Sequence, residues 1–309
     1  MRILVTGASG QVGSAVISTL QETDTVVAAD RSILDLSQPE SLPGTLDRLA
    51  PDVIVNAAAY TAVDQAEDEP ALAMCVNATA PGVMARWAAD RAVPFIHFST
   101  DYVFSGEGQR PWREEDATAP LSVYGASKRA GEQEIAAAGG CSLILRTSWV
   151  YAAKGKNFLR TMARLASERT ELRVVADQIG APTSARLLAD SVARMLTGGR
   201  GDLCARATQA QGVVHISASG ATSWHQFASA IVEGLRSRGV RLAVVRVVPI
   251  SSEDYPTRAT RPRNSRLDLR RLGEVFGITP SPWEQDLAPE LDIVAHELVQ
   301  NASQFSELR

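Results

Sequence analysis

The sequence lacks the features of several large protein classes. Its 309 residues include 31 Lys or Arg and 35 Asp or Glu, and the net charge of -4 provides no basic surface for nucleic acid. No apolar run approaches the roughly 20 residues that a membrane-spanning helix needs, and no signal peptide precedes the first strand-like run. We therefore expect a cytoplasmic protein that binds neither nucleic acid nor a membrane.

Cysteine and histidine are also few and scattered. Cys75, Cys141 and Cys204 show no metal-site spacing, so we expect neither a disulfide framework nor a zinc site. The four histidines do not cluster either. Hydrophobic residues, by contrast, make up 45% of the chain, which is enough for a sizeable core. A length of 309 residues predicts two domains, or one large α/β domain with an extension.

The N-terminal segment has the pattern of a dinucleotide-binding turn. Residues 2–6 form a short β-branched run that predicts a buried parallel strand. Gly7, Gly10 and Gly13 follow in the spacing G-x-x-G-x-x-G, and a helical pattern then extends to Leu20. Such glycines allow a tight turn and let a pyrophosphate approach the backbone at the helix N-terminus. A plain glycine-rich turn is the alternative.

Two charged residues after the second predicted strand bear on the choice of nicotinamide cofactor. This strand covers residues 25–29 and ends at Asp30 and Arg31. An acidic residue here typically bonds the ribose hydroxyls of NAD, whereas an arginine accommodates the 2′-phosphate of NADP. Because both are present, the choice between NADH and NADPH stays open, with a slight preference for NADPH.

Small or polar residues follow the next two predicted strands, which cover residues 53–56 and 94–98. The residues that follow are Ala57, Ala58, Ala59 and Tyr60 after the first strand, and Ser99, Thr100 and Asp101 after the second. The alternation of strands and helices predicts a doubly wound parallel sheet with helices on both faces. In such a sheet, ligands bind where the carboxyl ends of the strands meet.

A tyrosine and a lysine lie four residues apart in a helix predicted to begin near Ser122. Tyr124 and Lys128 would share one face of that helix, so the phenol and the ammonium can meet. A nearby cation favours the phenolate and lowers the pKa of a tyrosine from its usual value of about 10. Such a tyrosine can exchange a proton with a substrate oxygen, with Thr100 as a second donor. A solvated helix face is the alternative.

The second half of the chain predicts a smaller domain. We expect a dinucleotide-binding domain over residues 1–150, to which later segments return, and a substrate domain over residues 151–309. The expected helices cover residues 157–168, 184–197 and 223–236, the expected strands cover 172–175, 213–217 and 243–248, and 198–212 is expected to be a glycine-rich connection. Six arginines between residues 256 and 271 predict either a solvated loop or an anion site.

In this order, the motifs resemble the extended short-chain dehydrogenase/reductase family. Within it, the dTDP-4-dehydrorhamnose reductases are the more similar group, and the similarity covers nearly the whole chain. The segments that carry it are GASGQVG (7–13), NAAAYTAVDQAE (56–67), STDYVF (99–104), YGASK (124–128), RTSWVY (146–151), DQIGAPT (177–183) and RPRNSRLD (261–268). Seven such segments, spread in order over both halves, form a specific pattern.

The resemblance implies roles for individual residues. Tyr124 would be the proton donor, Lys128 would orient the nicotinamide ribose and lower the pKa of Tyr124, and Thr100 would complete the triad. The residues implied to bind the cofactor are Gly7, Gly10, Gln11, Val12, Gly13, Asp30, Arg31, Asp35, Leu36, Ala58, Ala59, Tyr60, Thr61, Ser99, Tyr124 and Lys128. Those implied to bind the deoxysugar are Thr100, Asp101, Tyr124 and Trp149, with the Arg-rich segment near the dTDP end.

The implied reaction is the NAD(P)H-dependent reduction of the C4 ketone of dTDP-4-dehydro-L-rhamnose to dTDP-L-rhamnose. Negative charge grows on the ketone oxygen as hydride arrives, and Tyr124 protonates that oxygen. A reductase of another dTDP-4-keto-6-deoxysugar would use the same chemistry. A regulatory subunit of the same fold would not, and the presence of Thr100, Tyr124 and Lys128 speaks against it.

One departure from the family concerns a metal. Some relatives bind magnesium at a dimer interface through a carboxylate cluster, and the matching positions here are Ala15, Arg186 and Leu187. None of these is a carboxylate, and the guanidinium of Arg186 would repel a cation. We therefore expect no metal ion and a monomer.

Overall fold

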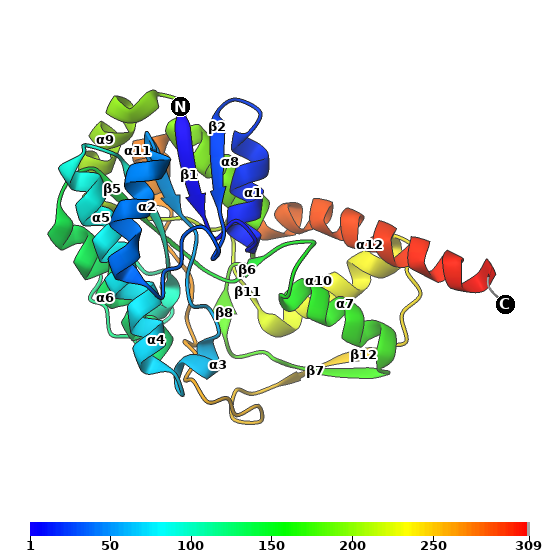
Figure 1. The fold of residues 1–309 in the computed structure, drawn as a ribbon. Coiled ribbons are helices and arrows are strands. Elements are labelled where there is room, and N and C mark those ends of the chain that lie inside the picture. Colours follow the sequence, from blue (N-terminus) through cyan, green and yellow to red (C-terminus); the bar gives the residue numbers. More distant parts are fainter. Residues whose placement is uncertain (308–309) are drawn as a thin grey trace.

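The computed structural model describes the backbone of residues 1–307 and the side chains of residues 1–300, in two lobes (Figure 1). The first lobe holds a six-stranded parallel sheet with the strand order β10-β5-β4-β3-β1-β2. These strands are β1 (Arg2–Thr6), β2 (Thr25–Ala29), β3 (Val53–Asn56), β4 (Phe95–Thr100), β5 (Ser142–Thr147) and β10 (Val213–His215). The order reverses between β1 and β3, and this switch point is where doubly wound sheets bind ligands. The predicted fold class is confirmed.

Helices cover both faces of this sheet because alternate strand residues point to opposite sides. On β1, Ile3 and Val5 pack on one face and Leu4 packs on the other. The first face carries α1 (Gln11–Leu20), α8 (Ala185–Leu196), α9 (Gly199–Gln209) and α11 (Arg270–Phe276), and the second carries α2 (Leu42–Leu49), α5 (Ala80–Asp90) and α6 (Val123–Ala138). Shorter helical segments are η1 (Pro39–Ser41), α3 (Val63–Ala66), α4 (Pro70–Met74), η2 (Cys75–Thr79) and η3 (Asp101–Val103).

The second lobe is smaller and shares its core with the first. In it, β7 (Glu171–Val175) pairs in parallel with β12 (Arg246–Ile250). The helices of this lobe are α7 (Phe158–Glu168), α10 (Trp224–Ser237) and the long α12 (Trp283–Glu307), and two short pairings join β6 (Val150–Tyr151) to β9 (Thr183–Ser184) and β8 (Ile179–Gly180) to β11 (Thr222–Ser223). One hydrophobic cluster runs from Val5 in the sheet through Tyr151 to Phe227 on α10, so the lobes are packed together.

The expectation of a glycine-rich connection over residues 198–212 is wrong. The structure places α9 there, with Gly199 and Gly201 in its first turn. Leu203 and Ala207 lie four residues apart and are buried against the sheet. This apolar contact outweighs the low helix propensity of the glycines, which lie at the helix end where they destabilise it least.

The expectation of no disulfide framework is also wrong, because one disulfide is present. Cys141, just before β5, forms a disulfide with Cys204 on α9, across 63 residues of sequence. The pairing was not predictable without α9, because only that helix brings the two sulfur atoms together. Cys75 is free. In the described part of the chain, no helix combines the length and hydropathy that crossing a membrane requires.

Candidate active site

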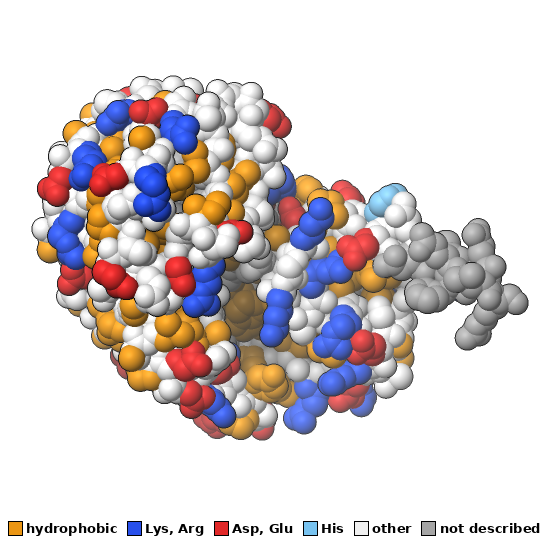
Figure 2. Space-filling view, in the orientation of Figure 1, with side chains coloured by type: hydrophobic (Ala, Val, Ile, Leu, Met, Phe, Trp, Pro, Cys, Tyr) orange, Lys and Arg blue, Asp and Glu red, His pale blue; other side chains and the backbone are white. Residues whose placement is uncertain are grey.

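A cleft of about 900 Å³ lies between the lobes, at the carboxyl edge of the large sheet. Figure 2 shows the hollow, with hydrophobic side chains in its depth and Lys and Arg side chains beside it. The predicted site residues that line this cleft are Gly7, Gly10, Gln11, Val12, Asp30, Arg31, Asp35, Leu36, Ala58, Ala59, Tyr60, Thr61, Ser99, Thr100, Asp101, Tyr124, Lys128 and Trp149. Gly13 lies behind the turn, where a Cβ would come within 2.1 Å of the Gly7 carbonyl oxygen.

The turn between β1 and α1 sets the N-terminus of the helix at the cleft, which Gly10, Gln11 and Val12 line. Gly7 has a φ of 66°, and a Cβ on it would lie 2.8 Å from the Ala58 nitrogen. Gly10 is the N-cap of α1 and provides no side-chain cap, while the buried Oε1 of Gln11 has no hydrogen-bond partner among the described residues. Free N–H groups at the positive end of a helix dipole favour an anion. This end of the cleft therefore fits the pyrophosphate of a dinucleotide.

The carboxylates after β2 are held by their own loop. Asp30 Oδ1 accepts hydrogen bonds from Ser32, at 2.9 Å from its backbone nitrogen and 2.6 Å from its hydroxyl, and these bonds lower the Asp30 pKa. Asp35 accepts the same pair of bonds from Ser37, at 2.9 and 2.7 Å, and forms an ion pair with Arg31. Asp30 and Arg31 both line the cleft, so a ribose hydroxyl or a 2′-phosphate can each find a partner there.

Asn77 holds the segment that follows β3. It lies in η2, a π-helical stretch between α4 and α5, of the kind often found at functional sites. Its side-chain oxygen accepts a bond from the Tyr60 nitrogen at 2.8 Å, and its side-chain nitrogen donates to the Tyr60 oxygen and to Ser127, both at 3.0 Å. Sequence reasoning assigned Asn77 no site role, because its partners are 17 and 50 residues away.

The structure brings Thr100 and Tyr124 together on the cleft floor. Thr100 Oγ1 donates to Asp101 at 3.1 Å, accepts from the Tyr102 nitrogen at 3.2 Å, and hydrogen-bonds the phenol of Tyr124. The Tyr124 ring meets the Tyr102 ring edge-on, with centroids 5.4 Å apart. The helix begins near Ser122 as predicted, and the Ser122 hydroxyl caps α6 and so fixes the start of the helix that carries the phenol.

The expectation that Lys128 lowers the pKa of Tyr124 is wrong in this structure. Burial raises the pKa of Tyr124 to about 12, with the Thr100 hydrogen bond opposing the rise. The described side chains of Tyr124 and Lys128 do not bond each other. Instead, the Lys128 ammonium donates to the Phe98 carbonyl at 2.7 Å and lies 3.0 Å from His97 Nε2. Both of these partners belong to β4, which draws the ammonium toward the sheet.

Two polar atoms at the cleft floor lack partners. Asp101 Oδ2 and Thr147 Oγ1 are buried and unpaired among the described side chains. Thr147 is the register partner of Thr100 on the neighbouring strand, and both residues line the cleft. Burial raises the pKa of Asp101 to about 6. Buried polar groups are ordinarily hydrogen-bonded, so these atoms mark positions that a polar ligand would complete.

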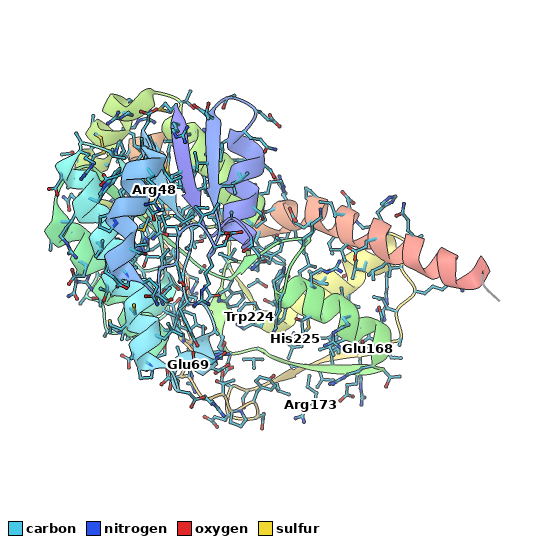
Figure 3. All side chains as sticks on the ribbon, viewed as in Figure 1. Arg48, Glu69, Glu168, Arg173, Trp224 and His225 are labelled. Atoms are coloured by element: carbon cyan, nitrogen blue, oxygen red, sulfur yellow. A yellow bond between two sulfur atoms is a disulfide. The ribbon has the colours of Figure 1, made fainter. Side chains whose placement is uncertain are left out.

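Two tryptophans form a wall on the side of the second lobe. Trp149 and Trp224 stack with their ring centroids 3.6 Å apart and their planes 11° from parallel. Gly180 lies against Trp149, where a Cβ would come within 2.6 Å of the indole. In Figure 3, Trp224 lies between the lobes. Trp149 was predicted from the resemblance, whereas the sequence around Trp224 indicated only a helix.

A second cavity of about 710 Å³ adjoins the cleft and shares Tyr102 and Trp224 with it. The arginines that line it are Arg169, Arg173, Arg261 and Arg263. Arg261 bonds Asp64 at 2.7 Å through one nitrogen, while its buried NH1 nitrogen has no partner in the part of the chain that the structure describes. Of the six arginines between residues 256 and 271, Arg261 and Arg263 therefore line this cavity and the other four do not.

A loop between β6 and α7 adds two cations that sequence reasoning missed. The chain has three lysines, Lys128, Lys154 and Lys156, and all of them line the cleft. Asn157 holds the loop by donating to two of its carbonyl groups, at 2.8 and 3.0 Å. Gly155 turns the loop with a φ of 79°. The sequence feature that could have drawn attention to Lys154 and Lys156 was the rarity of lysine in this chain.

The position compared with the family's magnesium site holds a guanidinium. Arg186 approaches Asp286 to 3.5 Å and Glu290 to 3.3 Å. Both carboxylates also accept other bonds, from Ser184 and from the Ala153 nitrogen. Among the described residues, no group of three or more His, Cys, Asp or Glu is arranged to hold a metal ion.

Comparison with known proteins identifies close relatives. Residues 1–295 match the family model described as "RmlD substrate binding domain". The chain is 50% identical over 287 residues to dTDP-4-dehydrorhamnose reductase of Burkholderia thailandensis, covering 92% of this chain and 95% of that one. It is 43% identical over 288 residues to the enzyme of the same name from Escherichia coli, with the same coverage.

Solved structures agree with the sequence relatives. A dTDP-4-dehydrorhamnose reductase from Clostridium acetobutylicum has a TM-score of 0.87 and 33% identity, covering 95% of this chain and 99% of that one. The reductase of the same name from Bacillus anthracis, solved in complex with NADP, has a TM-score of 0.83 and 34% identity, covering 96% and 99%. On the family match and these relatives, the chain belongs to the RmlD substrate binding domain family.

Proposed function

We propose that this chain catalyses the NADPH- or NADH-dependent reduction of the C4 ketone of dTDP-4-dehydro-L-rhamnose to dTDP-L-rhamnose. The observation that carries the proposal is one cleft that contains both the uncapped N-terminus of α1 and the hydrogen-bonded pair of Thr100 and Tyr124. The names of the sequence relatives support the sugar nucleotide, and the NADP complex from Bacillus anthracis supports the cofactor.

The roles of the side chains follow from their hydrogen bonds and charges. A bound reduced nicotinamide supplies the hydride. Tyr124, whose pKa is raised to about 12, keeps its proton at neutral pH and gives it to the ketone oxygen as negative charge grows there. When the ketone binds, the Thr100 hydroxyl would turn from Asp101 and donate its one hydrogen bond to the same oxygen. The carbonyl carbon gains the hydride, its oxygen gains the Tyr124 proton, and an alcohol results.

We further propose that the two lobes bind different parts of the ligands. The first lobe would hold the dinucleotide against the α1 turn, and the tryptophan wall would face the deoxysugar. The second cavity would take the dTDP end, because arginines bind phosphate oxygens through paired N–H groups. Arg261, with its unpaired buried nitrogen, is the arginine we favour for a diphosphate oxygen.

The test is cofactor oxidation by the purified protein, followed by absorbance. dTDP-4-dehydro-L-rhamnose should be reduced with NADPH or NADH, each supplied in a separate assay. Other dTDP-4-keto-6-deoxysugars serve as the comparison panel and should be reduced less efficiently. A higher kcat/KM for another sugar would move the assignment to that sugar, and no oxidation with any of them would overturn the enzyme assignment.

A prediction for cofactor binding concerns the two loop lysines. The double variant Lys154→Gln/Lys156→Gln should raise the Kd for NADPH by about tenfold, because it removes two cations that line the cleft beside the phosphate site. The salt dependence of binding should also become weaker. Fluorescence titration at two salt concentrations measures both effects. Lys154→Arg/Lys156→Arg keeps the charges and should bind like the wild type, and an unchanged Kd in the glutamine variant would exclude this role.

We also propose that the protein is a monomer without a structural magnesium ion. The Arg186 guanidinium occupies the space between Asp286 and Glu290, so these carboxylates already have a cationic partner. Light scattering with and without EDTA should give the same monomer mass. A dimer that dissociates in EDTA would contradict the proposal.

A further inference from the structure

The last rung of β4 and β5 carries two threonines at the edge of the cleft. Thr100 and Thr147 are register partners, both are 6% exposed, and both line the cleft. Two residues earlier on the same strands, Phe98 and Leu145 are register partners and belong to the hydrophobic cluster on one face of the sheet. Because alternate residues of a strand point to the same face, the two threonines continue this row where it reaches the cleft.

The two threonine hydroxyls differ in their hydrogen bonds. Thr100 Oγ1 bonds Asp101, the Tyr102 nitrogen and the phenol of Tyr124. Thr147 Oγ1 is buried, and it has no hydrogen-bond partner among the residues that the structure describes. A buried hydroxyl without a partner costs free energy, which a valine of the same shape would avoid. The roles proposed above for Thr100 and Tyr124 give the hydroxyl of Thr147 no function.

The register of the sheet sets Thr147 beside the reacting oxygen of the proposed substrate. Neighbouring strands lie about 4.8 Å apart, so the side chains of register partners on one face lie side by side. The proposed function places the C4 ketone oxygen against Tyr124 and Thr100. With hydrogen bonds of about 2.8 Å, an oxygen on the next ring carbon comes within reach of Thr147. A threonine hydroxyl turns between staggered positions about χ1, so it can face a group bound in the cleft.

The chemistry of the sugar decides which neighbour of C4 lies there. In dTDP-4-dehydro-L-rhamnose, C3 carries a hydroxyl group and C5 carries the methyl group. A threonine hydroxyl donates one hydrogen bond and accepts two, so it can pair with the C3 hydroxyl in either direction. With the sugar reversed, the Thr147 hydroxyl would face the methyl group and stay without a partner. The favoured orientation therefore has C3 on the side of β5.

We propose that Thr147 binds the C3 hydroxyl of the deoxysugar and makes the site selective for sugars that carry a hydroxyl next to the ketone. The inference rests on the proposed function, because it names the sugar group that the same cleft recognises. Thr147 takes no part in the transfer of hydride or proton. A sugar without the C3 hydroxyl leaves the threonine unpaired in the bound complex, and a site built around a hydroxyl rejects such an analogue.

The test compares two proteins with two sugars. Wild type and Thr147→Val are each assayed with NADPH and either dTDP-4-dehydro-L-rhamnose or its 3-deoxy analogue. With the first sugar, we expect Thr147→Val to lower kcat/KM by about tenfold, which corresponds to the loss of one hydrogen bond. With the 3-deoxy analogue, the variant should be as fast as the wild type or faster. The preference of the wild type for the first sugar should thus be weakened in the variant.

Stability measurements separate recognition of the sugar from structural support. Ligand-free Thr147→Val should have a Tm equal to or above that of the wild type, because a methyl group replaces an unpaired hydroxyl. Thr147→Ser keeps the hydroxyl and should restore most of the lost kcat/KM.

Thr183→Val is the matched control for the loss of a threonine hydroxyl. Thr183 is fully buried and does not line the cleft, and its hydroxyl donates to the Ala181 carbonyl at 3.0 Å and accepts from the Ala218 nitrogen at 3.2 Å. The control should therefore have a lower Tm, because its loss leaves both partners unpaired. Any change in its kcat/KM should be the same for both sugars.

The outcomes distinguish this inference from the proposed function. An equal loss with both sugars, or no loss with either, would overturn the role of Thr147. If the wild type reduces neither sugar, the proposed function is overturned, and calorimetric titration with dTDP-L-rhamnose and its 3-deoxy analogue makes the same comparison without turnover. Weaker binding of dTDP-L-rhamnose alone in Thr147→Val would then uphold the inference, whereas unchanged binding of both, or binding of neither by the wild type, would overturn it. If Thr147→Val does not fold, Thr147→Ala takes its place.

Discussion

Tyr124→Phe is expected to lower kcat at least about 100-fold, while the Kd for NADPH stays nearly unchanged. The substitution removes only the phenolic oxygen, which hydrogen-bonds Thr100 at the cleft floor. Without it, the ketone oxygen loses its proton donor in the transition state, whereas the dinucleotide keeps the α1 turn and the cleft walls. Steady-state kinetics and fluorescence titration of the same preparation measure the two quantities.

Tyr151→Phe is the matched control for the loss of a phenolic oxygen. Tyr151 is fully buried in the core and does not line the cleft, and its hydroxyl has no partner among the side chains described for residues 1–300. The variant should therefore retain wild-type kcat and stability. Wild-type turnover in Tyr124→Phe would remove Tyr124 from the chemistry. An equal loss in both variants would attribute the effect to packing.

Glu132→Ala is expected to reduce the free energy of unfolding by about 3–5 kcal/mol. Glu132 and Arg146 are 2% and 4% exposed, and they form two hydrogen bonds of 2.8 Å each. Glu132 also accepts a bond of 2.6 Å from Ser99. Its removal leaves the Arg146 guanidinium buried without its carboxylate, between the strand that carries Thr100 and the helix that carries Tyr124. Denaturant unfolding followed by circular dichroism measures the loss.

Glu134→Ala tests whether burial, rather than ion pairing itself, causes that loss. Glu134 lies two residues further along α6 and pairs with Arg86 at 2.9 Å, but both side chains are about half exposed. Exposed pairs contribute at most about 1 kcal/mol, so this variant should remain close to wild type. Similar losses of unfolding free energy in the two variants would show that burial of the Glu132–Arg146 pair does not cause the loss.

The residues at the ends of the parallel strands could be predicted from sequence. Gly7 and Gly10 follow β1, and Thr100 follows a run of apolar residues in β4. A parallel sheet gathers the carboxyl ends of its strands at one edge, so the order of motifs along the chain was enough to place these residues in one cleft.

Contacts between distant segments could not be predicted in the same way. His97 reads as one polar residue within an apolar strand, and only the sheet register reveals its neighbour Asn56. The Tyr124–Lys128 spacing did predict a shared helix face, yet the lysine bonds β4, because a long side chain reaches acceptors that helix periodicity does not include. The disulfide between Cys141 and Cys204 could not be predicted without α9. The glycines in residues 198–212 led to the prediction of a connection where the structure has this helix.

The most direct test follows a labelled hydride. The protein is incubated with dTDP-4-dehydro-L-rhamnose and NADPH carrying deuterium in the transferable C4 position, and the product is analysed by NMR and mass spectrometry. We predict dTDP-L-rhamnose with one deuterium, bound to C4 of the sugar. A product without deuterium, or deuterium at any other carbon, would contradict direct reduction of the ketone in this cleft.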